Sequence, residues 1–371
     1  MMPTLGTRLD RAGQPVRFLT FADGTRVLVL PAGGRLLGLY PPESDDNFLW
    51  TNPALARGAT ARTCFDRTGW INPGGDRTWL APEIELFIGD LTRPGETYAV
   101  QPALDPGCWT LTSATDTELC LTNATRLRLH RAGQQVGVRL CKHHRPAANP
   151  LQFTALAGAG LQYAGYTQVT TIELEPVADA SIRLGIWNLL QLPLPGVMLI
   201  PTRFEVQPQV MFGTPAAATL SVAPHLVRWE MADSSANAKV GINAQPLTGR
   251  AGYLRQNASG GTADLVVREF AVDPNGDYVD ALWEHPHEPG WVFQACCVRV
   301  GEDRFNELEY HAPAVTAAAG SNHGRDESRV WAFRGPGPAI AEAAATLLGE
   351  SSIPPLPNSA GRWEFQERKV I

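Results

Sequence analysis

The sequence has neither a basic cluster nor a long hydrophobic run. Its 371 residues include 31 lysines and arginines against 37 aspartates and glutamates, a formal net charge of -6 at pH 7. Without a run of Lys and Arg, there is no basic surface to attract nucleic acid or an anionic membrane. No stretch approaches the roughly 20 apolar residues that span a bilayer, and the first residues lack the apolar core of a signal peptide. We therefore expect a cytoplasmic protein whose partners include neither nucleic acid nor a membrane.

Motifs that identify several common enzyme classes are also absent. There is no G-x-S-x-G elbow, no GxxxxGK[ST] phosphate loop, no H-E-x-x-H helix and no G-x-G-x-x-G turn after a strand. A serine hydrolase, a P-loop NTPase, a zincin and a dinucleotide-dependent oxidoreductase are thus disfavoured. The six cysteines show no C-x-x-C spacing, which favours reduced thiols over a zinc ribbon or a redox pair. We expect no resident cofactor.

Glycine and proline are abundant, and they separate short apolar runs. The chain has 35 Gly and 30 Pro but only 18% charged residues. Runs such as Arg26 to Leu30, Leu36 to Leu39 and Gln135 to Leu140 lie between turn formers, at a spacing of about ten residues. Only Ala339 to Leu348 has the composition and length of a helix. Because no linker divides the chain, the sequence predicts one all-β domain, residues 1–371, built as a large antiparallel β-sandwich.

The stretch from Gly69 to Asp90 combines turn formers, aromatic residues and charges. Its glycine pair and two prolines predict a short, stiff loop that leads into an alternating strand over residues 84–88. An acid, a guanidinium and an indole on one loop suit a hydroxyl-rich ligand such as a sugar, through hydrogen bonds and stacking. The alternative is an Asp–Arg pair that only braces the loop. The candidate ligand-binding residues here are Asp76, Arg77, Trp79 and Glu83.

A second candidate is the segment FNELEYHAP near the C-terminal end. In a strand, the period of two places Glu307, Glu309 and His311 on one face and Leu308 and Tyr310 on the other. Two carboxylates side by side raise the pKa of at least one of them, which suits general acid/base chemistry or a divalent cation. The alternative is a polar strand that faces solvent.

Two weaker candidates remain. In Trp187-Asn188, an indole and an amide interrupt an apolar strand, so they either bond neighbouring backbone or point into a groove. In the turn around His285, the H-x-H pair is interrupted by proline, so the two imidazoles need not share a face. We expect an exposed loop or a sugar contact at His285 and assign no metal there.

Four segments together resemble the galactose mutarotase-like superfamily, and in particular its bacterial branches of unknown function. They read GGRLLGLYPPESDDNFLW, GGDRTWLAPE, WNLLQLP and FNELEYHAPAV, the last followed by His323 and VWAFRG. The resemblance covers most of the chain in order. It implies a β-supersandwich with a sugar bound in a groove on its concave face.

In the aldose 1-epimerases of this superfamily, a glutamate takes the proton of the anomeric hydroxyl while a histidine protonates the ring oxygen. By motif position Glu309 resembles that glutamate, and Arg77 resembles the substrate-binding arginine. The histidine belongs to an H-x-Y-F-N-L-type strand, where this chain has Trp187-Asn188 instead. His311, His285 and His225 are alternatives for the acid, and the sequence does not choose among them.

The resemblance implies an aldose 1-epimerase-like isomerase acting on a mono- or oligosaccharide. Glu309 would be the base, with Glu307 or His311 tuning it. One alternative is a polysaccharide lyase or glycoside-cleaving enzyme with a divalent cation beside the glutamates, and another is a non-catalytic carbohydrate-binding protein. Homodimer formation stays open. We expect the loop 74–83 to meet the strand 305–311 in the largest groove of the molecule.

Overall fold

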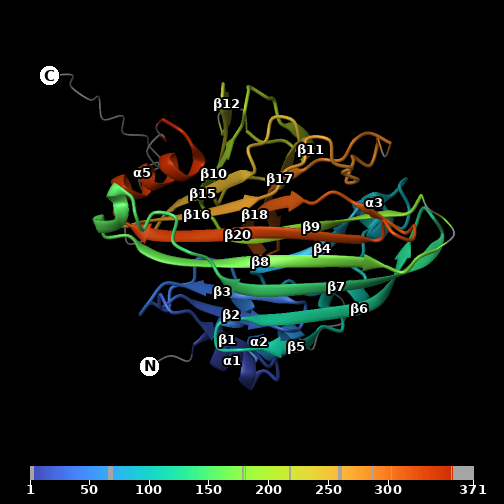
Figure 1. Ribbon diagram of the computed structural model, residues 1–371, viewed down its shortest axis with the longest axis horizontal. Helices are drawn as coiled ribbons and strands as arrows, with labels where there is room; N and C mark the ends of the chain where they lie inside the picture. The colour runs from blue at the N-terminus through green and yellow to red at the C-terminus, as the bar shows by residue number, and fades with distance from the viewer. Residues whose placement is uncertain are drawn as a thin grey trace.

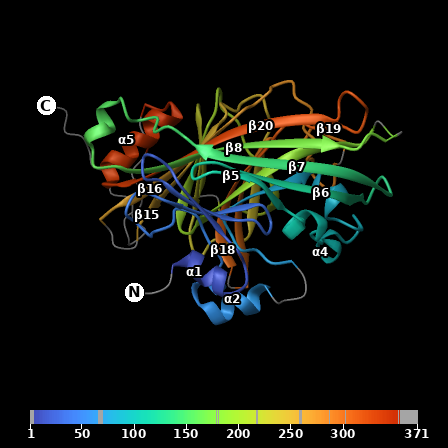
Figure 2. The ribbon, with the colours of Figure 1, turned by 60° about the horizontal axis from the view of Figure 1, so that its bottom comes forward.

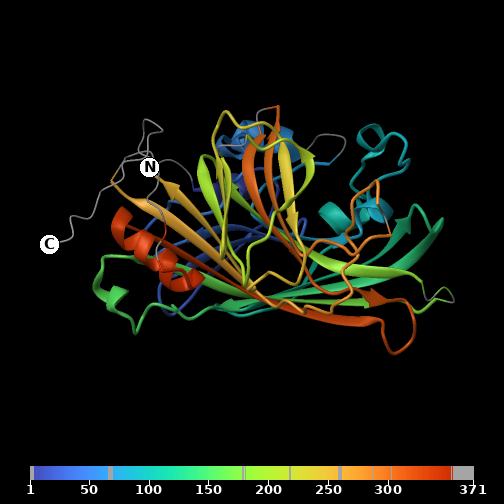
Figure 3. The ribbon, with the colours of Figure 1, turned by 90° about the horizontal axis from the view of Figure 1, so that it is seen from above.

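The structure is a computed structural model that describes residues 4–65, 70–177, 179, 181–216, 219–257, 261–285, 287–301, 303–351 and 353; Gly69 lies outside these ranges. Two large antiparallel sheets face each other across a shared hydrophobic core (Figure 1). Seen from above, the orange strands of one sheet run across the long strands of the other (Figure 3). The prediction of an all-β antiparallel sandwich is confirmed.

The first sheet carries the candidate site. Its order is β1-β2-β3-β4-β9-β18-β17-β14-β11, and β19 pairs with β9. The strands are β1 (Arg17–Thr20), β2 (Arg26–Leu30), β3 (Arg35–Tyr40), β4 (Asp76–Ala81), β9 (Arg183–Pro193), β18 (Asp303–His311), β17 (Phe293–Val300), β14 (Ala238–Ile242), β11 (Gln209–Gly213) and β19 (Val315–Thr316).

The second sheet contains the longest strands and forms the other layer. Its order is β12-β13-β10-β15-β16-β20-β8-β7-β6-β5. The strands are β12 (Leu220–Ala223), β13 (Leu226–Met231), β10 (Gly196–Pro201), β15 (Arg250–Gln256), β16 (Ala263–Phe270), β20 (His323–Gly335), β8 (Gln162–Leu174), β7 (Gln134–Pro146), β6 (Leu119–Leu129) and β5 (Thr110–Ala114).

Helices are short, and α3 and η2 add Leu86 and Leu104 to the core that the two sheets share. They are α1 (Leu5–Arg11), α2 (Gly58–Phe65), α3 (Glu83–Leu86), α4 (Pro94–Thr97), α5 (Gly337–Leu348) and the single turns η1 (Pro53–Ala56), η2 (Ala103–Gly107) and η3 (Ala155–Gly158). Near the N-terminus, α1 and α2 lie together (Figure 2) and pack on apolar residues of β2 and β3. Among the described residues, no helix is long and apolar enough to cross a membrane.

Helix α5 confirms the one helix that the sequence predicts. Its buried alanines and leucines pack on a second apolar cluster formed with strands of the second sheet. The helix ends at Gly349, whose φ of 76° is the left-handed conformation that glycine adopts without strain.

Two local predictions are wrong. The segment 84–88 begins as helix α3 and is not a strand, because its apolar residues at 84, 87 and 88 also fit the spacing of one helical turn. The predicted loop around residue 77 is strand β4, which pairs with β9 from Asp76 to Ala81. All six residues of β4 are buried. Because both faces of the strand are covered, its sequence does not alternate between polar and apolar residues and does not mark it as a strand.

Candidate functional site

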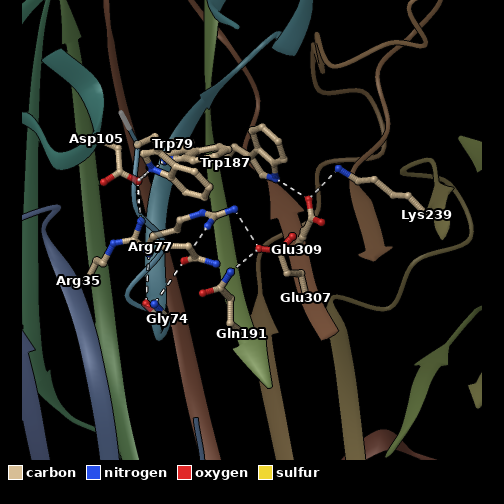
Figure 4. Close-up of polar contacts among 12 residues, drawn as sticks. Arg35, Gly74, Arg77, Trp79, Asp105, Trp187, Gln191, Lys239, Glu307 and Glu309 are labelled. Atoms are coloured by element: carbon tan, nitrogen blue, oxygen red, sulfur yellow. Dashed lines mark hydrogen bonds and ion pairs between the residues drawn. The ribbon is translucent and has the colours of Figure 1, made fainter. Parts of the chain in front are cut away.

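Strands β4 and β18 flank β9, and their outward side chains meet across it. Leu189 of β9 lies opposite both Arg77 and Glu309, and residues opposite each other on paired strands share a face. Arg77 reaches over β9, and its Nη2 donates to Oε1 of Glu307 at 2.9 Å, although the two residues are 230 positions apart (Figure 4). The segment 74–83 therefore meets the strand 305–311, as expected, but the two meet on a buried face, and neither lines the wide groove of about 810 Å³.

Arg77 is held flat against aromatic rings. Its guanidinium carbon lies 3.9 Å from the ring centre of Trp79 and 5.4 Å from that of Trp70. Both indole N–H groups donate to Oδ2 of Asp105, at 2.9 and 3.0 Å, and this oxygen also accepts from Arg35 at 2.6 Å. The rings are thus fixed by a buried ion pair, and they fix the guanidinium in turn through cation–π contact.

Glu307 completes this half of the site. Its Oε1 accepts from Arg77 and from Nε2 of Gln191, each at 2.9 Å. Two donors on one oxygen hold the carboxyl group of Glu307 in one position. Glu307 therefore acts as a fixed partner for Arg77.

Glu309 lies next along the strand and has one oxygen free. Its Oε2 accepts from Nε1 of Trp187 at 2.9 Å and from Nζ of Lys239 at 3.0 Å (Figure 4). Its Oε1 is buried and receives no hydrogen bond from the residues that the structure describes. Burial raises the pKa of Glu309 to about 7, and Lys239 opposes this rise. Such a carboxyl group can take and return a proton near neutral pH.

Lys239 connects Glu309 to the surface. It lines a small depression with a volume of only about 10 Å³. It also faces Glu83, which accepts from the hydroxyl of Tyr98 at 3.0 Å and from Nε1 of Trp283 at 3.3 Å. Burial also raises the pKa of Glu83, while Lys239 lowers it. The depression is lined by Glu83, Met211, Phe212, Lys239, Ala281, Leu282, Trp283 and Glu284.

His311 occupies the end of the same face and is fully enclosed. Its ring stacks on Trp187 with ring centres 5.3 Å apart, and its Nε2 lies 3.6 Å from Oδ2 of Asp280. Burial lowers the pKa of His311 to about 4, although Asp280 opposes this. The imidazole is therefore neutral at pH 7. The predicted division of β18 holds, because Tyr310 faces the other way and bonds Asp326.

Asp76 and Asn188 do not join the site. Both side chains point to the inner face, which packs on the second sheet. Asp76 bonds Arg268 at 3.0 Å and the hydroxyl of Tyr166 at 2.6 Å, whereas Asn188 donates to Asp326 at 3.0 Å. Their placement among the sugar-binding residues is wrong because they are strand neighbours of Arg77 and Trp187, and successive strand residues face opposite sides.

The remaining histidine candidates lie elsewhere. His285 is exposed in a turn, and the adjacent Pro286 lies outside the described residues. His225 lines a wider groove of about 810 Å³ on the second sheet. Charged side chains there pair with one another, as in Arg250–Glu269, Arg329–Glu269 and Arg325–Glu327. Neither Arg77 nor Glu309 lines this groove.

The site also contains atoms at metal-ligand spacing. One ligand atom each of Cys296, Glu307 and Glu309 lies within 4.8 Å of the others. However, Arg77 and Lys239 already pair with these carboxylates. Burial, followed by the nearby Glu309, keeps the pKa of the Cys296 thiol well above its usual value, whereas metals bind the thiolate. The residues thus do not fit the divalent cation that the sequence left open.

Lys239 is one of the site residues that the sequence analysis missed, together with Trp70, Asp105 and Gln191. Lys239 stands in a short strand between the buried residues Ala238 and Val240, and the chain has only three lysines. A lysine that alternates with core residues is expensive to bury unless it is paired. The position of Lys239 in the strand could therefore have indicated a buried ion pair. The sequence could not identify its partner, Glu309, which lies on a strand more than sixty residues away.

Comparison with known proteins gives fold-level likenesses only. No family model matches the sequence, and no curated protein matches it. A galactose 1-epimerase from Lactobacillus acidophilus NCFM has 9% identity and a TM-score of 0.39, covering 87% of this chain and 99% of that one. A GalM/aldose epimerase homologue from C. elegans has 9% identity and a TM-score of 0.38, covering 86% and 99%. The Slr1438 protein from Synechocystis sp. PCC 6803 has 11% identity and a TM-score of 0.44, covering 86% and 95%. The antiparallel sandwich itself is established by the sheets of this chain, and the solved structures that are similar to it include aldose 1-epimerases.

Proposed function

We propose that this protein binds a sugar beside Glu309 and exchanges its anomeric configuration, as an aldose 1-epimerase-like isomerase. Glu309 is the general base that takes the proton of the anomeric hydroxyl. One observation carries the proposal: a buried carboxyl group with a pKa of about 7 keeps one oxygen free of hydrogen bonds from the described residues. A base with its pKa near the working pH is efficient in both directions of a reversible proton transfer.

The surroundings of Glu309 support a sugar as the ligand. Arg77 and Glu307 form a fixed donor and acceptor pair that suits neighbouring hydroxyl groups. At the mouth of the depression, the side chains of Phe212 and Trp283 offer apolar ring faces for C–H groups of a sugar.

The experiment is polarimetry with freshly dissolved α-glucose and α-galactose. The protein is expected to accelerate the approach to anomeric equilibrium, and Glu309→Gln is expected to lose at least about 10²-fold in rate. Glu175→Gln, at an exposed position directly after strand β8, serves as the matched control. Undiminished acceleration by Glu309→Gln would exclude Glu309 as the base.

Other outcomes select the other functions. Sugar binding in calorimetry without acceleration selects a non-catalytic carbohydrate-binding protein. Release of unsaturated, ultraviolet-absorbing products from oligosaccharides selects a lyase.

A further inference from the structure

We propose that Cys120 and Cys141 form a reversible disulfide bond when the protein meets a low-molecular-weight disulfide such as oxidised glutathione. The two cysteines lie on the second sheet, whereas Glu309 lies on the first, so this inference does not depend on the proposed function. Three observations support it: the contact between the two sulfur atoms, the register of their strands, and the access of small molecules to Cys141.

The contact between the sulfur atoms is the first observation. The Sγ atoms of Cys120 and Cys141 lie 2.7 Å apart, whereas the two sulfurs of a disulfide are separated by about 2.0 Å. Cysteines whose side chains point apart cannot be joined unless the backbone moves. These two side chains already point at each other, so the bond requires only a small further approach.

The register of strands β6 and β7 holds the two thiols together. The strands run side by side (Figure 1), with Cys120 opposite His143 and Thr122 opposite Cys141. The two cysteines are therefore diagonal neighbours, and strand alternation places them on the same face of the sheet. This is the outer face, because both cysteines are partly exposed while the residues on either side of each along its strand are buried. The contact thus follows from continuous strand pairing and not from a loop conformation.

Small molecules can reach this pair from solvent. Cys141 lines a depression of about 460 Å³ on the outer face, together with residues that include Arg139 and His323. Cys64, Cys296 and Cys297 are buried, in contrast to the partly exposed Cys120 and Cys141. A small disulfide can therefore approach the sulfur of Cys141.

The exchange reaction balances with the small disulfide as the oxidant. The thiolate of one cysteine attacks a sulfur of the small disulfide, whose S–S bond breaks and releases one small thiolate. The thiolate of the other cysteine then attacks the protein sulfur of the mixed disulfide and releases the second. The two protons of the cysteine thiols pass to the two small thiolates. The protein is oxidised by two electrons, and the small disulfide is reduced to two thiols.

The local surroundings indicate when this exchange is fast. Burial, followed by the hydrogen bond with Cys120, raises the pKa of the Cys141 thiol to about 11. Because the thiolate is the nucleophile, the rate of disulfide formation is expected to increase with pH between pH 7 and pH 9.

The sequence analysis favours reduced thiols, and Cys120 and Cys141 are thiols in the structure. Their pairing has no sequence signature, because the two residues are 21 positions apart and form no spaced motif. In a reducing compartment a disulfide of this kind is transient, as in redox sensing.

The test treats the purified full-length protein with oxidised glutathione, stops the exchange with acid and counts the thiols after unfolding. It uses wild type and Cys108→Ser, which removes the exposed cysteine that could otherwise hold glutathione. Cys108→Ser is expected to lose two thiols without gaining glutathione, and peptide mapping by mass spectrometry is expected to link Cys120 to Cys141 in both proteins. Dithiothreitol should restore the two thiols.

A second variant separates the cross-link from general thiol reactivity. In Cys108→Ser combined with Cys120→Ser, Cys141 has no partner for the bond, so it should keep its thiol or hold one glutathione. Loss of two thiols without bound glutathione in this double variant would overturn the proposal. A peptide map of oxidised wild-type protein without the link between Cys120 and Cys141 would overturn it as well, whether or not the variants fold.

Discussion

The two faces of the first sheet carry similar buried acidic residues, but the hydrogen bonds of these residues differ. On the inner face, Asp76 has both oxygens engaged, one by Arg268 and one by Tyr166. On the outer face, Glu309 has one oxygen engaged by Trp187 and Lys239 and the other free of the described residues. The inner face also keeps buried polar atoms without a described partner, such as Nε of Arg268 and Oδ1 of Asn306, so a free atom alone does not separate the faces. The raised pKa of the Glu309 carboxyl group does. We infer that the inner face holds the sheets together and that the outer face is built for a ligand.

Replacing the buried arginine of each face should show the largest difference in stability between the two faces. In Arg268→Met, Asp76 stays buried without its cation, and we expect a loss of about 3–5 kcal/mol in the free energy of unfolding. In Arg77→Met, Glu307 keeps Gln191, so the expected loss of stability is smaller, whereas sugar affinity falls. Urea unfolding and calorimetry measure the two effects. Equal losses of stability would mean that the outer cluster is structural as well.

The pH dependence of activity should follow Glu309. Because a general base must be ionised, kcat/KM should fall about tenfold per pH unit below the pKa of about 7. Polarimetric rates between pH 5 and pH 8 test this. A rate that stays level through pH 6 contradicts the role of Glu309 as a base.

The pH dependence of stability should carry opposite contributions from Glu309 and His311. The folded state raises the pKa of Glu309 from 4.5 to about 7, so it binds the extra proton, and this contribution is lost as pH rises through that window. It lowers the pKa of His311 from 6.5 to about 4, so this contribution is lost as pH falls through that range. Urea unfolding of Glu309→Gln and His311→Gln should therefore show changes of opposite slope between pH 4.5 and 6.5. If either substitution left the slope unchanged, the replaced group would titrate in the folded protein as it does in the unfolded chain.

The smallest effect is expected for His311→Phe. The imidazole makes no hydrogen bond with the described residues and stacks on Trp187. A phenyl ring of similar shape should change the free energy of unfolding by less than about 1.5 kcal/mol and leave kcat near the wild-type value. Loss of activity in a stably folded His311→Phe would mean that His311 supplies the proton to the ring oxygen.

Regular alternation explains what could be predicted from the sequence. The period of two separated Glu307 and Glu309 from Leu308 and Tyr310 correctly, because β18 is a straight, paired strand. The same rule would have separated Asp76 from Arg77, but the glycines and prolines around them indicated a loop. Since both faces of β4 are buried, no change of polarity marked it as a strand.

The sequence by itself determined the antiparallel sandwich and the row of acids on β18, because turn residues and strand alternation are local properties of the chain. Only the tertiary structure decided that Arg77 lies against Glu307 and Lys239 against Glu309. Those contacts depend on the order of strands in the sheet, which pairs segments far apart in sequence through backbone hydrogen bonds that any residue can make. The burial that raises the pKa of Glu309 is likewise a property of the packed sheet and of the residues that cover it.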